Sequence, residues 1–111
     1  MIDVEAMPHL ADIPRVQARL RPDDTAFWFE GETTSFAELE TRATQVANGL
    51  IGLGVQPDDR VGYLARNTAV YYEMLFGAAR ARATMTAVNT RLAAPEVKFI
   101  LSDARVKVLF V

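Results

Sequence analysis

Cysteine is absent from these 111 residues, and histidine occurs once, at His9. Without cysteine the chain can form no disulfide bond, no thiolate metal site and no cysteine nucleophile. One histidine cannot build a multi-histidine metal site, and it leaves little room for a Ser–His–Asp triad. These absences remove several common kinds of catalytic centre before any motif is considered.

Strong charge and long apolar runs are also missing. The formal net charge is −2, with no basic tail or stripe, which argues against a nucleic-acid-binding protein. No apolar run approaches the ~20 residues that a membrane-spanning helix needs. Asp3 and Glu5 precede any apolar stretch, unlike the start of a signal peptide. We therefore expect no nucleic-acid partner, no transmembrane segment and a cytoplasmic location.

The segment that organises the chain lies between residues 59 and 92. Residues 61–65 form a short apolar run, which is typical of a strand buried on both faces. Asn67 or Thr68 can cap the following helix, expected over residues 69–81, where polar side chains are few. Residues 84–88 are β-branched or apolar and predict a second strand. Strand, crossover helix and strand predict a βαβ unit and a parallel sheet.

Two elements precede a long central helix. A short helix is expected from Asp12, with Asp12 as its cap and Val16 and Leu20 on its apolar side. Residues 26–30 and 32–34 predict a hairpin that turns at Gly31. Trp28 and the phenylalanines beside it are expected to cover a sheet rather than to form a ligand platform. The arginines at positions 15, 19 and 21 are expected on a solvated helix face.

Ser35 and Glu38 form a capping box that begins the long helix. Its apolar residues recur at spacings of three and four, which places them on one face. Gly52 and Gly54 end the helix, so they are not a phosphate-binding loop, which follows a strand and opens a helix. The expected apolar face consists of Phe36, Leu39, Ala43, Val46, Leu50 and Leu53.

The last part of the chain predicts one more helix and one more strand. Pro95 suits a first helical turn, and residues 97, 100, 101 and 104 form its apolar stripe. Residues 106–111 predict a further buried strand, which runs to the last residue. We therefore expect an α/β fold with an N-terminal β-hairpin and a βαβαβ parallel-sheet unit. We also expect residues 1–111 to be a single incomplete domain of a longer protein.

No constellation of residues in this sequence predicts a reaction. Asp58 and Asp59 are adjacent carboxylates, but a solvated turn explains them better than an acid–base dyad. Arg80 and Arg82 close a helix, where cations favour the dipole. No P-loop, dinucleotide fingerprint or metal motif occurs. We assign no catalytic, no cofactor-binding and no metal-binding residue to this chain.

The pattern as a whole resembles the N-terminal portion of the adenylate-forming acyl-CoA synthetases. Residues 34–39 look like the family's TYxEL segment, and residues 88–92 followed by Glu96 look like its PLNxRL segment. The resemblance covers residues 22–111, and the order and spacing of the segments carry it. Further matching residues are Pro22, Asp23, Ala26, Ala47–Leu50, Leu53–Val55, Asp59–Val61, Asn67 and Phe99–Leu101.

Four positions depart from the family's pattern. The family usually has glycine where Asp58 and Arg82 stand, and proline where Ala87 stands. A threonine or serine helix cap is usual near Ala93. These are structural positions, so the departures bear on the local turn geometry rather than on membership of the family.

The resemblance implies the N-terminal fragment of an ATP-dependent fatty-acid CoA ligase. Such an enzyme uses ATP and Mg²⁺ to form an acyl-adenylate and then passes the acyl group to coenzyme A. The family's phosphate loop, its nucleotide and Mg²⁺ motifs and its catalytic lysine all lie downstream of the region present here. We expect the fragment itself to be an inactive scaffold that binds no cofactor.

Other interpretations remain open. The parent could be an aryl-CoA ligase or the adenylation domain of a peptide synthetase, because acyl selectivity resides in the missing part. The chain could also be a naturally short, non-catalytic interaction module with the same partial fold. A free-standing flavodoxin-like binding protein is disfavoured, because no glycine loop follows a strand. In isolation the fragment is expected to self-associate through uncovered sheet or helix surface.

Overall fold

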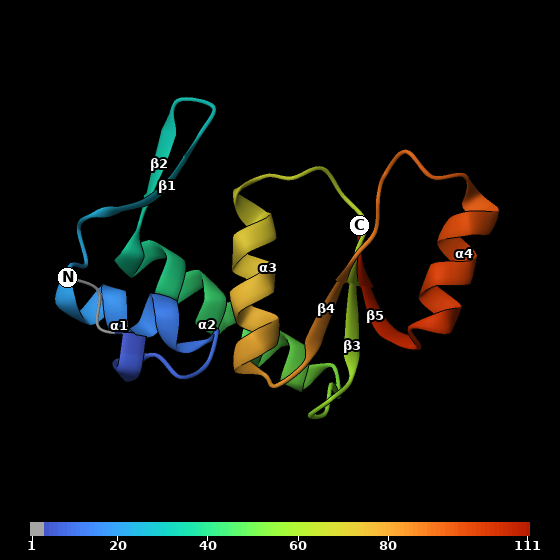
Figure 1. The fold of residues 1–111 in the computed structure, drawn as a ribbon, viewed down its shortest axis with the longest axis horizontal. Coiled ribbons are helices and arrows are strands. Elements are labelled where there is room, and N and C mark those ends of the chain that lie inside the picture. Colours follow the sequence, from blue (N-terminus) through green and yellow to red (C-terminus); the bar gives the residue numbers. More distant parts are fainter. Residues whose placement is uncertain (1–3) are drawn as a thin grey trace.

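The computed structural model describes residues 4–111; Asp3, which entered the signal-peptide argument, lies outside them. Two sheets and four α-helices follow one another along the chain (Figure 1). The expected hairpin and all the expected helices and strands are present, with ends shifted by a few residues. The last strand is not buried as expected, because it lies at the edge of the sheet. The elements are η1 (Val4–Ala6), α1 (Asp12–Leu20), β1 (Thr25–Phe29), β2 (Glu32–Ser35), α2 (Phe36–Gly52), β3 (Arg60–Tyr63), α3 (Ala69–Arg80), β4 (Thr84–Ala87), α4 (Ala94–Asp103) and β5 (Val106–Phe110).

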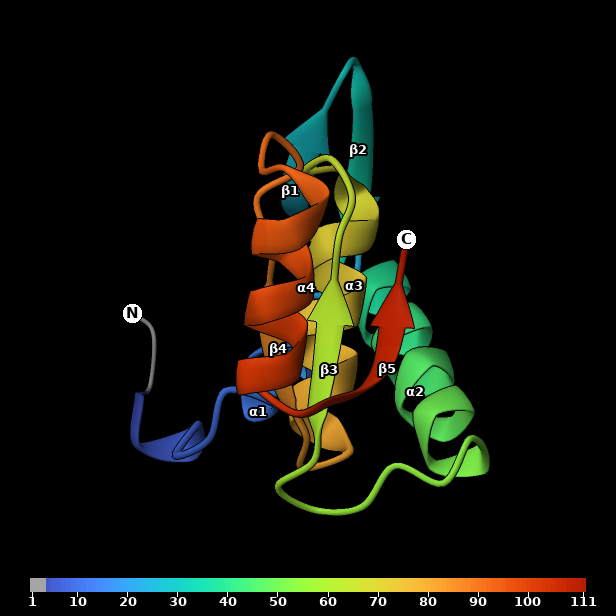
Figure 2. The same ribbon diagram turned by 90° about the vertical axis from the view of Figure 1, so that its right-hand side faces the viewer.

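The larger sheet is parallel and has the strand order β4-β3-β5. The first crossover, through α3, moves from β3 to one edge, and the second, through α4, moves back past β3 to the other. Crossovers of the same hand that run in opposite directions place their helices on opposite faces of a sheet. Figures 1 and 2 show this arrangement, with α3 on one face and α4 on the other. The α/β class is as predicted.

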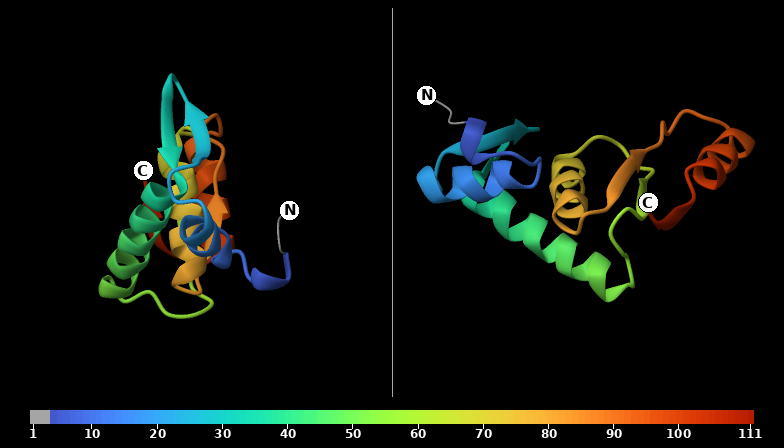
Figure 3. Two further views of the ribbon diagram at one scale, coloured as in Figure 1. Left: turned by 90° about the vertical axis from the view of Figure 1, so that its left-hand side faces the viewer. Right: turned by 60° about the horizontal axis from the view of Figure 1, so that its bottom comes forward.

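The best-packed part of the molecule lies between α2, α3 and the sheet. In Figure 3 the long helix α2 runs alongside α3 on its way to β3. Gly77 of α3 allows this approach, because a Cβ atom there would collide with Val46 and lie 3.0 Å from the Ala43 carbonyl oxygen. The buried cluster on this face contains Ala47, Leu50, Val55, Val61, Tyr63, Met74, Ala78, Ala81 and Ala83.

An ion pair joins three helices beside this core. The Arg80 guanidinium donates to both Glu40 carboxylate oxygens, at 2.5 and 2.6 Å, and to the Thr44 hydroxyl. It also donates to the Ala11 carbonyl oxygen at 3.2 Å, just before α1. The bidentate geometry is the stronger form of this pair. Arg80 therefore links α3 to α2 and α1, in addition to the helix-dipole role that the sequence suggested.

The β-hairpin is confirmed, but one aromatic residue is not placed as expected. Glu30 and Gly31 have φ angles of 48° and 84°, the left-handed pair that suits a two-residue hairpin. Phe27 packs against Tyr72 of α3, with ring centroids 5.1 Å apart. Trp28 is 67% exposed, so the expectation that it covers a sheet is wrong. Successive strand residues point to opposite faces, and only the face with Phe27 meets a helix.

The helix starts are largely as predicted, and α2 ends at Gly52 as predicted, but two leucines at helix ends are not buried. The capping box is present, with Glu38 N donating to Ser35 Oγ at 3.1 Å and Ser35 N to Glu38 Oε2 at 3.3 Å. Leu20 and Leu53 were expected on apolar faces, but both are exposed: Leu20 is the last residue of α1, and Leu53 is the C-cap after α2, where the regular helical spacing stops. Asp12 lies inside the first turn of α1 rather than at its N-cap.

Three of the four departures from the family pattern fall at special backbone positions, whereas Ala87 is simply the last residue of β4. Asp58 and Arg82 have φ angles of 71° and 60°, the left-handed region that favours glycine. The Asp58 amide donates to the Arg82 carbonyl oxygen at 2.9 Å, so the two strained turns support each other. Ala93 occupies the N-cap of α4 and makes no side-chain cap bond. The turn geometry thus persists without the residues that normally favour it.

Within residues 4–111, no helix is both long enough and apolar enough to cross a membrane.

Candidate functional site

A crevice opens at the carboxyl ends of β3 and β4. The chain leaves β3 toward α3 on one face and leaves β4 toward α4 on the opposite face, so the two loops diverge. In open parallel sheets this switch point is where ligands bind. The crevice measures about 520 Å³ and is lined by Ala65, Arg66, Asn67, Tyr71, Ala87, Val88, Asn89, Thr90 and Arg91.

The lining of the crevice is positively charged. Arg66 stands on the loop after β3 and Arg91 on the loop after β4, and both are exposed. Among the described residues no aspartate or glutamate lines the crevice, although acidic residues outnumber basic ones in the chain as a whole. Guanidinium groups suit phosphate and carboxylate, to which they can donate two parallel hydrogen bonds. The arrangement can therefore hold an anion.

Local hydrogen bonds shape both walls. On the β4 side, Asn89 Oδ1 accepts a hydrogen bond from Arg91 N at 2.9 Å, which folds residues 89–91 into a tight turn. On the β3 side, Thr68 caps α3, because its Oγ1 accepts from Val70 N at 3.3 Å. The sequence left Asn67 and Thr68 as alternative caps for α3, and in the structure Thr68 is the cap. The turn and the cap fix where each loop ends.

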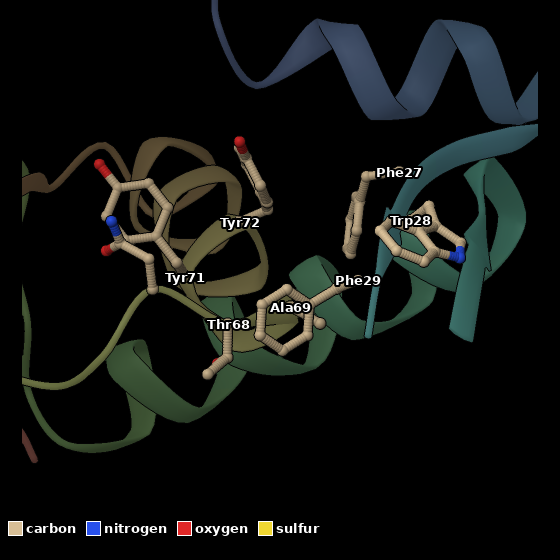
Figure 4. Close-up of a pocket in the computed structure, with 8 residues that line it drawn as sticks. Phe27, Trp28, Phe29, Thr68, Ala69, Tyr71 and Tyr72 are labelled. Carbon is tan, nitrogen blue, oxygen red and sulfur yellow. The ribbon is translucent and has the colours of Figure 1, made fainter. Parts of the chain in front are cut away.

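A second hollow, of about 390 Å³, lies between the hairpin and the start of α3 (Figure 4). Tyr72 and Phe27 meet across it, while Trp28 extends from the far side of β1. Within residues 4–111 no charged side chain lines it, so it offers aromatic contact and little that would orient a ligand. Its walls are Phe27, Trp28, Phe29, Asn67, Thr68, Ala69, Tyr71 and Tyr72.

The adjacent carboxylates do not form a catalytic pair. Asp59 Oδ2 accepts a hydrogen bond from Gln56 N at 2.7 Å and pairs with Lys107 Nζ at 3.1 Å. The Gln56 amide first, and then Lys107, hold the pKa of Asp59 below its usual value of 3.8. Asp58 is exposed in its strained turn. Among the described residues, no group of three or more His, Cys, Asp or Glu side chains gathers to hold a metal.

The sequence analysis assigned no site residue, and it missed the crevice. A usable signal was present, because polar or basic side chains follow two consecutive strands of the predicted βαβ unit at 66–67 and 89–91. What the sequence did not give was the strand order. The crevice exists because β3 and β4 are neighbours whose outgoing loops diverge.

The fold is that of an α/β protein with a crevice at the carboxyl ends of its parallel strands, and comparison with known proteins narrows this class. The profile of the AMP-binding enzyme family matches residues 14–111. The chain belongs to this family.

Individual relatives support this family assignment. The chain is 40% identical over 100 residues to a feruloyl-CoA synthase of Amycolatopsis, which covers 90% of this chain and 20% of the relative. It is 39% identical over 93 residues to a fatty acid–[acyl-carrier-protein] ligase of Streptomyces coeruleorubidus, covering 84% of this chain and 18% of the relative. The solved Mycobacterium tuberculosis fatty acyl CoA synthetase superposes with a TM-score of 0.87 at 34% identity, over 93% of this chain and 21% of that one.

The chain thus spans about a fifth of the length of the curated relatives it matches. The similarity to the N-terminal region of acyl-CoA synthetases, expected from the sequence, is confirmed, and so is the fold class.

Proposed function

We propose that this chain is the N-terminal portion of an ATP-dependent ligase that activates a fatty acid as its acyl-adenylate and transfers it to coenzyme A. The family match over residues 14–111 is the observation that carries the proposal. The relatives are acyl ligases, and two of those named above act on fatty acids by their names. The parent would be an acid–thiol ligase, with this chain forming one part of its large domain.

A second substrate class has a specific observation in its favour. The 40% identity to a feruloyl-CoA synthase is as high as that to the fatty-acid ligases, so an aryl acid is the alternative substrate. The acyl-carrier-protein ligase offers a second thiol acceptor. Both acceptors are thiols, so the acid–thiol class holds for either.

Within the parent, we propose that the crevice contributes charge to the binding of a phosphate-bearing ligand. ATP and coenzyme A both carry phosphates, and Arg66 and Arg91 are the residues that would contact them. The described residues offer no ligand set for Mg²⁺, and we assign none.

The role of the chain follows from what the crevice lacks. Acyl-adenylate formation needs groups that stabilise developing charge at the reacting phosphate. Two exposed arginines at the edge of a sheet can orient a ligand, but they exclude no water. We therefore propose that residues 1–111 alone are inactive and that they supply scaffold and a phosphate-facing surface.

A segment exchange tests this proposal. Residues 12–111 would replace the matched segment of the Amycolatopsis feruloyl-CoA synthase. ATP–pyrophosphate exchange would then be measured with ferulic acid and, separately, with fatty acids. We expect the chimera to keep the recipient's acid preference, and residues 1–111 alone to give no exchange. Exchange by the isolated chain would overturn the scaffold role, and a chimera that now prefers fatty acids would place selectivity in this segment.

Arginine variants of the chimera test the crevice. Arg91→Ala and Arg66→Ala should each raise the KM for the ligand whose phosphates they contact about tenfold, since a charge-assisted hydrogen bond contributes roughly 1.5 kcal/mol. Separate titrations of ATP and coenzyme A identify which ligand that is. Arg19→Ala removes the same charge from α1, outside the crevice, and serves as the control. Unchanged KM values for both ligands would refute a phosphate role for the crevice.

We further propose that the isolated chain self-associates through the free edge of β5. In the described residues β5 pairs only with β3, and Leu109, Phe110 and Val111 are exposed beside its open edge. An open edge strand is a template for pairing. Sedimentation velocity over a wide concentration range should show oligomers that Val111→Lys weakens and Leu53→Lys does not. A single monomeric species throughout would contradict the proposal.

A further inference from the structure

Tyr63 directly precedes the loop after β3 that lines the crevice. It is the last residue of β3, at the centre of the sheet, and pairs with Ala87 of β4 and Phe110 of β5. Its side chain is among the largest fully buried ones, with 2% of its surface exposed. A tyrosine in such a place must satisfy its hydroxyl group, because an unpaired buried hydroxyl costs free energy.

Two hydrogen bonds connect Tyr63 to the two walls of the crevice. Its hydroxyl donates to the Arg66 carbonyl oxygen at 2.8 Å, on the wall that follows β3. Its own carbonyl oxygen accepts a hydrogen bond from Val88 N at 2.8 Å, where the wall that follows β4 begins. One residue thus holds the main chain of both walls.

The ring of Tyr63 is itself fixed. Phe110 stacks on it, with centroids 5.5 Å apart and planes 5° from parallel. Tyr71, from α3, meets it edge-on at 5.4 Å and 89°. Both arrangements are favourable aromatic geometries. Because elements on both sides hold the ring, its hydroxyl has a defined position from which to bind the loop.

The loop that receives this bond has few other anchors. Within the described part of the chain, the main chain of residues 64–67 is hydrogen-bonded to the rest of the fold at two points. Leu64 N donates to the Phe110 carbonyl oxygen at 2.8 Å, and the Arg66 carbonyl oxygen accepts from Tyr63. Arg66 and Asn67 are both exposed, so neither is held by burial.

We propose that Tyr63 is a positioning residue that sets Arg66 opposite Arg91 and so pre-forms the anion-binding crevice. It acts through the Arg66 main chain and does not touch the ligand. The inference rests on the proposed phosphate role of the crevice. A loop that is already ordered loses less conformational freedom on binding, and this raises affinity without any new contact.

Tyr63→Phe removes only the hydroxyl and leaves the ring between its aromatic neighbours. Backbone order parameters from ¹⁵N relaxation of residues 1–111 should fall at residues 65–67 from about 0.85 to below about 0.6. Titration with inorganic pyrophosphate and, separately, with coenzyme A should show affinity about tenfold weaker for the ligand that the wild type binds. Tyr72→Phe, which removes an exposed hydroxyl from α3 outside the crevice, should change neither quantity.

The possible outcomes distinguish the positioning role of Tyr63 from the proposed phosphate role of the crevice. The positioning role is overturned if Tyr63→Phe leaves the order parameters of residues 65–67 unchanged. It is also overturned if these order parameters fall but the affinity for pyrophosphate or coenzyme A stays the same. If the wild type binds neither pyrophosphate nor coenzyme A, the phosphate role of the crevice fails. In that case the order parameters still decide whether Tyr63 holds the loop.

Discussion

The two faces of the parallel sheet are covered very differently. On one face, α3 is pressed between α2 and the sheet, and its Met74, Gly77 and Ala78 are buried. On the other face α4 has no buried residue, and its Phe99 is 69% exposed. Both helices have apolar stripes, yet only α3 has a second helix behind it. The number of packing partners, rather than hydrophobicity, determines burial here.

The more exposed face of the sheet can also be compared with the greater length of the family's other members. The chain spans about a fifth of its curated relatives, and the exposed apolar residues Phe99, Leu109, Phe110 and Val111 lie on α4 or at the end of β5. A large exposed apolar patch marks an interaction site in soluble proteins. The tightly packed face should therefore tolerate substitution poorly, and the open face should tolerate it well.

The largest expected effect comes from comparing two glycines. Gly77 faces α2 on the tightly packed side of the sheet, and Gly62 faces α4 and β5 on the other side. Gly77→Ala should destabilise the fold by about 2 kcal/mol, because the new methyl group meets Val46 and the rigid main chain at Ala43. Gly62→Ala should cost less than about 1 kcal/mol, because its methyl meets only side-chain ends, such as Leu109 Cδ1 at 2.8 Å. Urea unfolding with a shared m-value measures both.

Gly49→Ala is the control for the loss of glycine itself. It lies in α2 with nothing within 4 Å of the added atom, so it should stabilise the helix by about 0.5–1 kcal/mol. Equal costs at Gly77 and Gly62 would show that the two faces are packed alike, against the comparison drawn above.

A smaller effect contrasts the starts of the same two helices. Thr68 caps α3, so Thr68→Ala should cost about 1 kcal/mol. Ala93 stands at the N-cap of α4 in extended conformation without a cap bond, so Ala93→Ser should stabilise by about 0.5–1 kcal/mol. Thermal unfolding of the single variants measures both changes.

Ala94→Ser, one residue further into α4, adds the same hydroxyl where it cannot cap the helix. It should leave the midpoint of thermal unfolding unchanged or slightly lower. If Ala94→Ser and Ala93→Ser stabilise equally, the gain does not come from capping.

Most of the local structure was predictable because its causes are local. The capping box at Ser35 and Glu38, the turn at Gly31 and the βαβ unit all depend on residues close together in the sequence. The errors lie where packing decides. Leu20 and Leu53 continue the apolar spacing at the very end of their helices, where they are exposed, and Trp28 occupies the exposed face of its strand.

The crevice was less predictable than the fold. Arg66 and Arg91 are separated by a whole helix and a strand, and each has an ordinary explanation as an exposed loop residue. The hydroxyl bond from Tyr63 to Arg66 is short in sequence, but its importance depends on a ring held by Phe110 from the far end of the chain. No local pattern contains that information.

The sequence by itself determined the helices, the strands, their caps and the family, because periodicity, turn residues and motif order are properties of neighbouring residues. Only the tertiary structure decided that β3 lies between β4 and β5, that α3 and α4 take opposite faces, and that two loops therefore part to form a crevice. The left-handed turns at Asp58 and Arg82 belong to this second group. A hydrogen bond between residues from distant segments supports them in place of the glycine that the local geometry favours.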